Sequence, residues 1–342
     1  MNAWSRTGVA SVREVRSCGG VNLRLSAVLG LVVTLAWPVA AAPAAFTRAF
    51  ALEKARAVDP AAQLPSDELP EGVTAREGLA YATRGDVELQ LDVYRPAGDG
   101  PFPAVILVHG GGWETGSREM ERPFAKRLAG AGFIAVPVSY RLGPAGRFPN
   151  ALHDLKSAVR WLRAHAAEHG IDAEEIGAVG ASAGGQLVAL LGATNAMERF
   201  EGDGPHREFP SVVQAVVNID GLADFTGREL LEQLRTQPGA PVRFLGGTFA
   251  EVPDVWKDAS ALTHVGLRSA PTLFINSTAP TPILPGREEM SRRLTMVGIP
   301  SEVLTMENSP HVFWLVEPWF GPTVDETVRF LREHLVGGEP VS

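Results

Sequence analysis

Short, unbroken runs of apolar residues alternate along this chain with segments of helical periodicity, and this pattern restricts the possible fold more than any other feature. The length and continuous apolarity of the runs are typical of strands buried on both faces of a sheet. The runs are residues 104–108, 133–138, 176–179, 212–219 and 272–275. Helical patterns occupy residues 118–131, 151–168, 183–193 and 286–298, and a strand at 302–306 precedes a final helix at 322–335. The alternation predicts an α/β domain whose mostly parallel sheet is covered by helices on both faces.

A hairpin precedes this alternation. Residues 87–94 alternate apolar and polar side chains with period two, as a half-exposed antiparallel edge strand does, and residues 73–82 can pair with them. Ligands of such sheets bind at the carboxyl ends of the strands. Residues 221–268 follow one of these ends and have little regular pattern. We therefore expect them to form a small cap over that edge.

The first 44 residues are organised like a secretory signal peptide. Four arginines precede the apolar run 25–42, and small residues follow at Ala42-Pro43-Ala44. A buried helix or a membrane anchor is the alternative, but Gly30 and Pro38 interrupt the run. We expect cleavage near residue 44, a secreted or periplasmic location, and no stable membrane association after cleavage.

The remaining chain is acidic and has no cysteine. Removing residues 1–44 takes away four arginines and Glu14, which leaves 27 Lys+Arg against 38 Asp+Glu and a net charge of −11. This balance argues against a nucleic-acid partner. The single cysteine, Cys18, is removed as well, which excludes a thiol nucleophile, a cysteine metal site and a disulfide. Residues 45–71, with three prolines among alanines and acids, suggest a linker or loosely ordered lead-in to a domain at 72–336.

The sequence Gly180-Ala181-Ser182-Ala183-Gly184 follows the strand at 176–179 directly and opens the helix at 183–193. In this setting a G-x-S-x-G motif forms a sharp turn that lifts the serine hydroxyl above the sheet, and only small flanking residues fit the turn. The helix N-terminus behind the serine favours developing negative charge. The motif predicts that Ser182 is a nucleophile; the alternative is a glycine-rich structural turn.

A second glycine motif, His109-Gly110-Gly111-Gly112-Trp113, ends the strand at 104–108. Such glycines allow backbone N–H groups to approach a substrate oxygen closely. We assign an oxyanion hole to the N–H groups of Gly111, Gly112 and Ala183. His109 is interpreted as a residue that packs the loop. No Gly-Lys-Ser/Thr follows, so the glycines do not indicate phosphate binding.

These motifs, together with SYRL at 139–142 and FPNALHDLKSAVRWLR at 148–163, resemble the α/β-hydrolase superfamily. Within it the pattern is similar to secreted esterases of the acetyl esterase, feruloyl esterase and hormone-sensitive-lipase-like groups, over about residues 72–336. The resemblance implies an eight-stranded sheet and a catalytic triad in the chain order Ser, Asp or Glu, His. It assigns the base to His311, which follows the last strand in Ser309-Pro310-His311.

The acid of this triad is missing from the place where the resemblance puts it. The turn at 276–285 after the seventh strand carries Thr281 where such esterases have an aspartate. The triad needs a carboxylate to orient the histidine and stabilise its charged form. The candidates are Asp220, at the end of the preceding strand, Glu288 in the first turn of the next helix, and Asp224. A Ser-His dyad or an inactive protein stays possible.

Tryptophans at or beyond strand ends suggest a substrate with flat faces. Trp113, Trp314 and Trp319 are assigned to substrate binding, because indoles stack against sugar rings or aromatic acyl groups, although they can equally cover the core. With the resemblance and the expected secretion, this favours a serine carboxylesterase that removes acyl groups, above all acetyl, from plant polysaccharides or their fragments. No metal or other cofactor is expected. The alternatives are a non-catalytic carbohydrate-binding protein and a serine peptidase of the same fold.

Overall fold

The computed structural model describes residues 46–336. The predicted signal peptide at 1–44 lies outside the described residues. Within 46–336, no helix is both long enough and apolar enough to cross a membrane.

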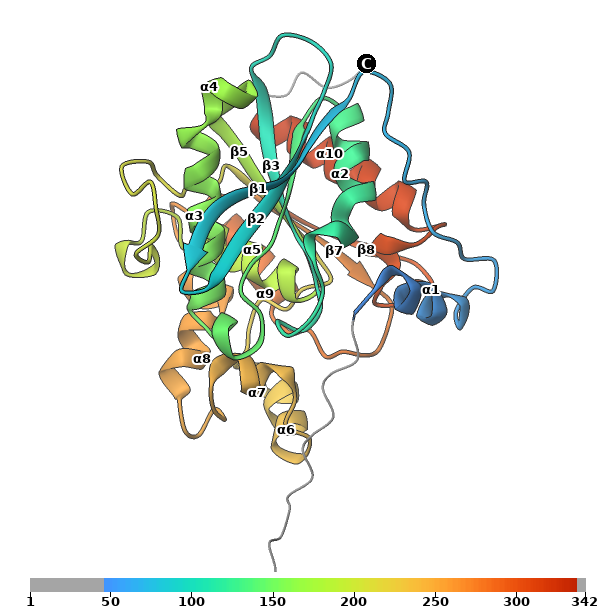
Figure 1. The fold of residues 1–342 in the computed structure, drawn as a ribbon. Helices are drawn as coiled ribbons and strands as arrows, with labels where there is room; N and C mark the ends of the chain where they lie inside the picture. Colours follow the sequence, from blue (N-terminus) through green and yellow to red (C-terminus); the bar gives the residue numbers. More distant parts are fainter. Residues whose placement is uncertain (1–45, 337–342) are drawn as a thin grey trace, which may run out of the picture. The chain divides into compact units, whose positions relative to one another are not determined.

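Eight strands form one sheet in the order β1-β2-β4-β3-β5-β6-β7-β8 (Figure 1). They are β1 (Thr74–Arg84), β2 (Val87–Arg95), β3 (Phe102–Val108), β4 (Ile134–Val138), β5 (Ile171–Ala181), β6 (Ala215–Ile219), β7 (Thr272–Ser277) and β8 (Ser301–Met306). β2 runs antiparallel to β1 and β4, and all other neighbours are parallel. The predicted eight-stranded, mostly parallel sheet with its N-terminal hairpin is thus confirmed.

Helices cover both faces of this sheet, because side chains of its buried strands alternate between two apolar cores. On β3, Ile106 and Val108 pack into one core, while Val105 and Leu107 pack into the other. The first core includes α3 (Asn150–Ala164), α5 (Ala183–Ala193) and α9 (Arg287–Met296). The second includes α2 (Arg122–Gly130) and α10 (Phe320–Leu335). These five helices fall in the segments where periodicity predicted them.

The segment 45–71, predicted as a linker or loosely ordered lead-in, contains a helix that the prediction missed. α1 (Arg48–Arg56) begins at Thr47, whose hydroxyl accepts a hydrogen bond from the Phe50 N–H at 3.2 Å. Ala51 and Ala55 of this helix are fully buried in the second core. Further on, Gln63 pairs with Glu317 in an isolated antiparallel bridge. The residues of α1 are good helix formers, and the prolines that suggested a linker, Pro60, Pro65 and Pro70, all follow this helix.

The segment predicted as a cap contains helices. Between β6 and β7 lie α6 (Arg228–Thr236), α7 (Ala240–Leu245) and α8 (Pro253–Ala259), grouped at one end of the sheet (Figure 1). α6 buries Leu230 and Leu234. These helices were not predicted from the sequence, although Leu230 and Leu234 of α6 have helical spacing.

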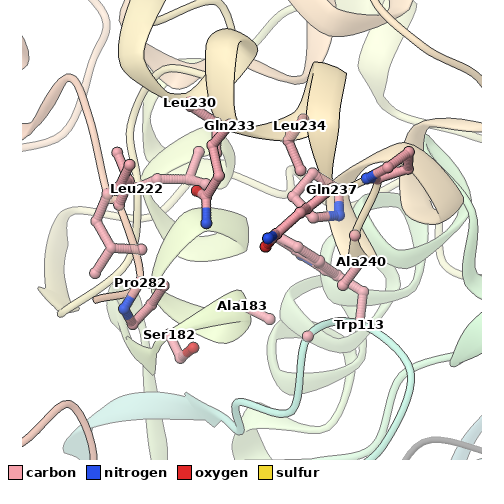
Figure 2. A pocket seen from close by; sticks show the side chains of 16 residues that line it. Trp113, Ser182, Ala183, Leu222, Leu230, Gln233, Leu234, Gln237, Ala240 and Pro282 are labelled. Atoms are coloured by element: carbon pink, nitrogen blue, oxygen red, sulfur yellow. The ribbon is translucent and has the colours of Figure 1, made fainter.

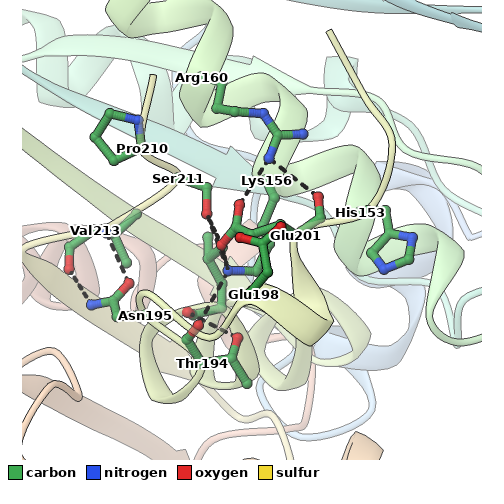
Figure 3. A network of polar contacts seen from close by, with 12 residues as sticks. His153, Lys156, Arg160, Thr194, Asn195, Glu198, Glu201, Pro210, Ser211 and Val213 are labelled. Atoms are coloured by element: carbon green, nitrogen blue, oxygen red, sulfur yellow. Dashed lines mark hydrogen bonds and ion pairs between the residues drawn. The ribbon is translucent and has the colours of Figure 1, made fainter. Parts of the chain in front are cut away.

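A buried network of charged groups fixes the loop before β6 to α3 (Figure 3). Glu201 accepts from Lys156 Nζ at 3.0 Å, from Arg160 Nη1 at 2.8 Å and from Ser211 Oγ at 2.8 Å. The side chains of Lys156 and Arg160 are at most 1% exposed, and that of Glu201 is 14% exposed. The two buried cations therefore share the carboxylate of Glu201 as their counter-charge, away from bulk water.

Glu201→Gln is expected to destabilise the protein by about 3 kcal/mol, because it leaves two buried cations without a counter-charge. The free energy of unfolding in urea measures the effect. The matched control is Glu198→Gln, which breaks an exposed ion pair with Arg207 in the same loop and should cost no more than about 1 kcal/mol. Equal losses in the two variants would contradict a structural role for this network.

Candidate active site

Ser182 lies at the turn between β5 and α5, with the backbone angles φ 53° and ψ −118°. Such a conformation is strained for a residue other than glycine. Its neighbours must be small: a Cβ at Gly180 would lie 2.3 Å from the Gly184 carbonyl oxygen, and a Cβ at Gly184 would lie 2.0 Å from that of Val108. The glycines of the motif are therefore sterically required, and the turn presents the Ser182 hydroxyl at the carboxyl edge of the sheet.

His311 reaches this serine from the loop between β8 and the short helix η5 (Phe313–Leu315). Its Nε2 lies 2.9 Å from Ser182 Oγ. Its Nδ1 lies 2.7 Å from Oδ2 of Asp220. The three side chains thus form one continuous chain of hydrogen bonds from a hydroxyl through an imidazole to a carboxylate.

Asp220 comes directly after β6, in a left-handed conformation with φ 51°. Its N–H donates to the Ile275 carbonyl of β7 at 2.9 Å, which continues the strand pairing and orients the residue. The carboxylate is buried, and burial by itself raises a carboxyl pKa. Hydrogen bonds from His311 and Ser277 outweigh burial and hold the pKa of Asp220 below its ordinary value of 3.8. The carboxylate is therefore charged at neutral pH.

The other two candidate acids do not reach His311. Glu288 accepts a hydrogen bond from Asn276 Nδ2 at 3.2 Å. Asp224 accepts from the N–H and the hydroxyl of Thr226, at 2.7 Å and 2.6 Å, in a local turn. Of the three carboxylates considered from the sequence, the structure brings Asp220 to the histidine.

The proposed oxyanion loop lies against the serine. Gly111 has φ 120°, and a Cβ there would lie 2.1 Å from the Thr115 carbonyl oxygen, so this position requires glycine. Within residues 46–336, the N–H groups of Gly111, Gly112 and Ala183 have no protein acceptor. That of Ala183 is free because the residue opens a helix. These donors are available to a substrate oxygen.

His109 supports this loop from behind. Its ring stacks on Tyr140 with 4.5 Å between the centroids, and the Tyr140 hydroxyl donates to the His109 carbonyl at 2.9 Å. Burial lowers the pKa of His109 to about 4, so the ring is neutral at neutral pH. The interpretation of His109 as a packing residue agrees with this environment.

A cavity of about 420 Å³ opens above Ser182, between the cap and the turn at 282–284. Figure 2 shows Gln233, Leu234 and Gln237 of the cap on the side of the cavity facing Ser182. Leu222 and Pro282 line one side, and Trp113 and Ala240 the other. The cap residues were not singled out from the sequence; their signal is the spacing of Leu230, Gln233 and Leu234 on one face of α6, and Gln237 follows directly after this helix.

The three tryptophans assigned to substrate binding differ in their positions. Trp113 lines the cavity, stacks on Phe244 of α7 with centroids 4.7 Å apart, and donates from Nε1 to Gln186 at 3.0 Å. Trp314 is fully buried, and Trp319 is 8% exposed with its Nε1 directed at the Glu307 carbonyl. For Trp314 and Trp319 the substrate-binding prediction is wrong, because both complete the apolar core beneath the His311 loop.

One group of side chains in the described part of the chain is close enough to share a cation, namely Glu302, Glu333 and His334. They lie on β8 and α10, and none of them lines the cavity above Ser182. Around the cavity itself, the hydroxyl of Ser182, the imidazole of His311 and the carboxylate of Asp220 are the groups suited to acyl transfer.

A sheet of this topology, with a nucleophile turn after β5 and a histidine after β8, defines the α/β-hydrolase fold. Residues 91–287 match the model of the BD-FAE family of α/β-hydrolase esterases, and the chain belongs to that family.

Three relatives illustrate the likeness. Esterase LipC of Mycobacterium tuberculosis is 31% identical over 237 residues, which cover 68% of this chain and 59% of LipC. The propionate-bound esterase 2 of Thermogutta terrifontis has a TM-score of 0.64 and 25% identity, and the match covers 81% of this chain and 98% of that one. A truncated carbohydrate esterase from gut microbiota, at a TM-score of 0.69, 22% identity and coverage of 80% and 100%, shares the fold. The chain spans about half the length of the curated relatives it matches.

Proposed function

We propose that this protein is a serine carboxylesterase that removes acyl groups, preferentially acetyl, from plant polysaccharides or their oligosaccharide fragments. The observation that carries the proposal is the unbroken chain of hydrogen bonds Ser182–His311–Asp220 beneath the cavity. Relatives named as esterases and a carboxylesterase support the reaction class.

The proposed reaction passes through an acyl-enzyme. Ser182 Oγ attacks the ester carbonyl while His311 Nε2 takes the hydroxyl proton, and Asp220 stabilises the resulting imidazolium. The N–H groups of Gly111, Gly112 and Ala183 bind the oxyanion of the tetrahedral intermediate. The imidazolium then protonates the departing sugar hydroxyl. Water attacks the acyl-serine with His311 again as the base, which releases the carboxylic acid and restores Ser182.

The lining of the cavity supports a small acyl group on a polar alcohol. Leu222, Leu230 and Ile283 provide apolar surface for a short alkyl chain. Gln233 and Gln237 add two side-chain amides, which can donate to and accept from sugar hydroxyls. A structure of esterase 2 of Thermogutta terrifontis has propionate, a short-chain acid, bound.

A secreted or periplasmic location is part of the same proposal. Its support is the signal-peptide organisation of residues 1–44. The non-catalytic alternative rested on the absence of an acid from the turn at 276–285. Asp220, on the neighbouring strand, can take the place of that acid beside His311. No contact within 46–336 favours the peptidase alternative.

The test compares kcat/KM for p-nitrophenyl acetate, butyrate and octanoate, and acetate release from acetylated xylo-oligosaccharides. We expect saturable hydrolysis, with acetate esters preferred to octanoate by at least about tenfold, because a long alkyl chain would cover the side-chain amides of Gln233 and Gln237 without hydrogen-bonding to them. Release of acetate from the oligosaccharides should be at least as efficient as from the aryl ester. Aryl ester hydrolysis without acetate release from the saccharides would contradict the carbohydrate substrate and leave the esterase reaction standing.

A further inference from the structure

Two residues outside the proposed triad hold the carboxylate of Asp220. Ser277 donates twice, from its N–H to Oδ1 at 3.0 Å and from its hydroxyl to Oδ2 at 2.6 Å. Arg287 donates from Nη1 to Oδ1 at 2.7 Å and forms an ion pair there. With His311 Nδ1, these groups supply four donors to a side chain that is 1% exposed. Water is thereby replaced by protein donors around a buried charge.

Both of these residues flank the turn that has no acid. Ser277 ends β7 and Arg287 begins α9, so they stand on either side of the proline-rich residues 278–286. β6 and β7 are neighbours, and Ile219 pairs with Ile275, which brings the residues after these two strand positions together at the sheet edge. The two residues that flank the turn donate hydrogen bonds to an aspartate at the end of the neighbouring strand. In similar esterases the turn carries the aspartate itself.

The guanidinium of Arg287 acts on the carboxylate that also faces His311. The side chain of Arg287 is 14% exposed, so solvent screens its charge little. Within residues 46–336, Asp220 forms ion pairs with Arg287 and His311 alone. The acids that follow on α9 are engaged elsewhere: Glu288 accepts from Asn276, and Glu289 pairs with Arg292 and Arg293. Arg287 is therefore the cation positioned to compete with the imidazolium for the charge of Asp220.

We propose, on the basis of the hydrolase function inferred above, that Arg287 is a positioning residue of this active site. Together with Ser277 it fixes the Asp220 carboxylate opposite His311. Its guanidinium also competes with the imidazolium of His311 for the charge of that carboxylate. The physical reason is that a carboxylate shared with a guanidinium stabilises an imidazolium less than an unshared one.

Arg287→Gln removes the charge and keeps a hydrogen-bond donor. Without the guanidinium, the Asp220 carboxylate stabilises the imidazolium of His311 more strongly, so the acid limb of the kcat/KM profile for p-nitrophenyl acetate should move up by about one pH unit. The ratio of kcat/KM at pH 9 to that at pH 6 is then expected to be larger than in the wild type. Arg287→Lys restores the charge and should return the limb towards the wild-type position. A limb that stays in place, or moves to lower pH, would overturn the proposal.

The matched control is Arg292→Gln on the same helix, since its side chain is 59% exposed and pairs with Glu289. Its pH profile should equal that of the wild type. If Arg287→Gln does not fold, Ser277→Ala removes one donor to the same carboxylate and should shift the limb in the same direction by a smaller amount. An unchanged limb in Ser277→Ala would then count against the proposal.

A second readout does not depend on turnover. The His311 ring carbon in ¹³C-histidine-labelled protein, assigned by its loss in His311→Asn, reports the protonation of the imidazole directly. Its titration should shift upward in Arg287→Gln. If the wild type hydrolyses no ester, the proposed function fails while this titration still decides the role of Arg287.

Discussion

Ser182→Ala is expected to lower kcat for p-nitrophenyl acetate by roughly 10⁵- to 10⁶-fold, because it removes the group that forms the acyl-enzyme. The geometry behind this expectation is the 2.9 Å contact between Ser182 Oγ and His311 Nε2, at a turn whose neighbouring glycines leave no room for a side chain. Steady-state kinetics measures the loss. A fluorophosphonate probe should add its mass to the wild type once and to the variant not at all.

The matched control is Ser139→Ala. Ser139 also follows a strand of the sheet, β4, but its hydroxyl accepts from Arg118 and takes no part in the Ser182–His311–Asp220 chain. This variant should keep activity within about threefold of the wild type. Residual hydrolysis in Ser182→Ala at a rate near that of the wild type would reject a serine mechanism and reopen the non-catalytic alternative.

Asp220→Asn is expected to lower kcat by about 10⁴-fold. An amide at this position cannot stabilise the imidazolium of His311, and it can hold the ring in the wrong tautomer. The pKa of Asp220 lies below its ordinary value of 3.8, so the wild-type carboxylate is charged throughout pH 6 to 9 and its own protonation adds no pH dependence to the loss in that range. The kcat of the variant across that range measures the effect.

Glu288→Gln and Asp224→Asn are the controls for this prediction. Both replace carboxylates considered as alternative acids, and in the structure they bond to Asn276 and Thr226 instead of His311. Each should retain kcat within about tenfold of the wild type. A greater loss in Glu288→Gln than in Asp220→Asn would show that the acid has been assigned to the wrong residue.

The local sequence was sufficient to place a functional residue where its position depends on a single turn. Gly180 to Gly184 specify a strand-to-helix turn through their size alone, so the motif by itself places Ser182 at the sheet edge. The continuous apolar strands likewise predicted the parallel sheet, because strands covered on both faces cannot alternate polar and apolar residues.

The local sequence failed where burial decides the role. Trp314 and Trp319 lie on a segment between β8 and α10 that looks like a loop, but the core beneath His311 takes up both indoles. Residues 48–56 precede a proline-rich stretch and were grouped with it as a linker, yet Ala51 and Ala55 pack against that core. Whether a side chain is covered depends on segments distant in sequence, which no local pattern describes.

By itself, the sequence determined the sheet, the nucleophile turn, the position of His311 on the last loop and a short choice of acids. Only the tertiary structure decided among those acids and revealed Ser277 and Arg287 beside the chosen one. Ser182, Asp220 and His311 come from three separate strand ends, and parallel pairing of β5 and β6 sets the spacing between the first two. Hydrogen-bond geometry at 2.7 Å depends on that pairing and on the path of the His311 loop, which the order of residues along the chain does not specify.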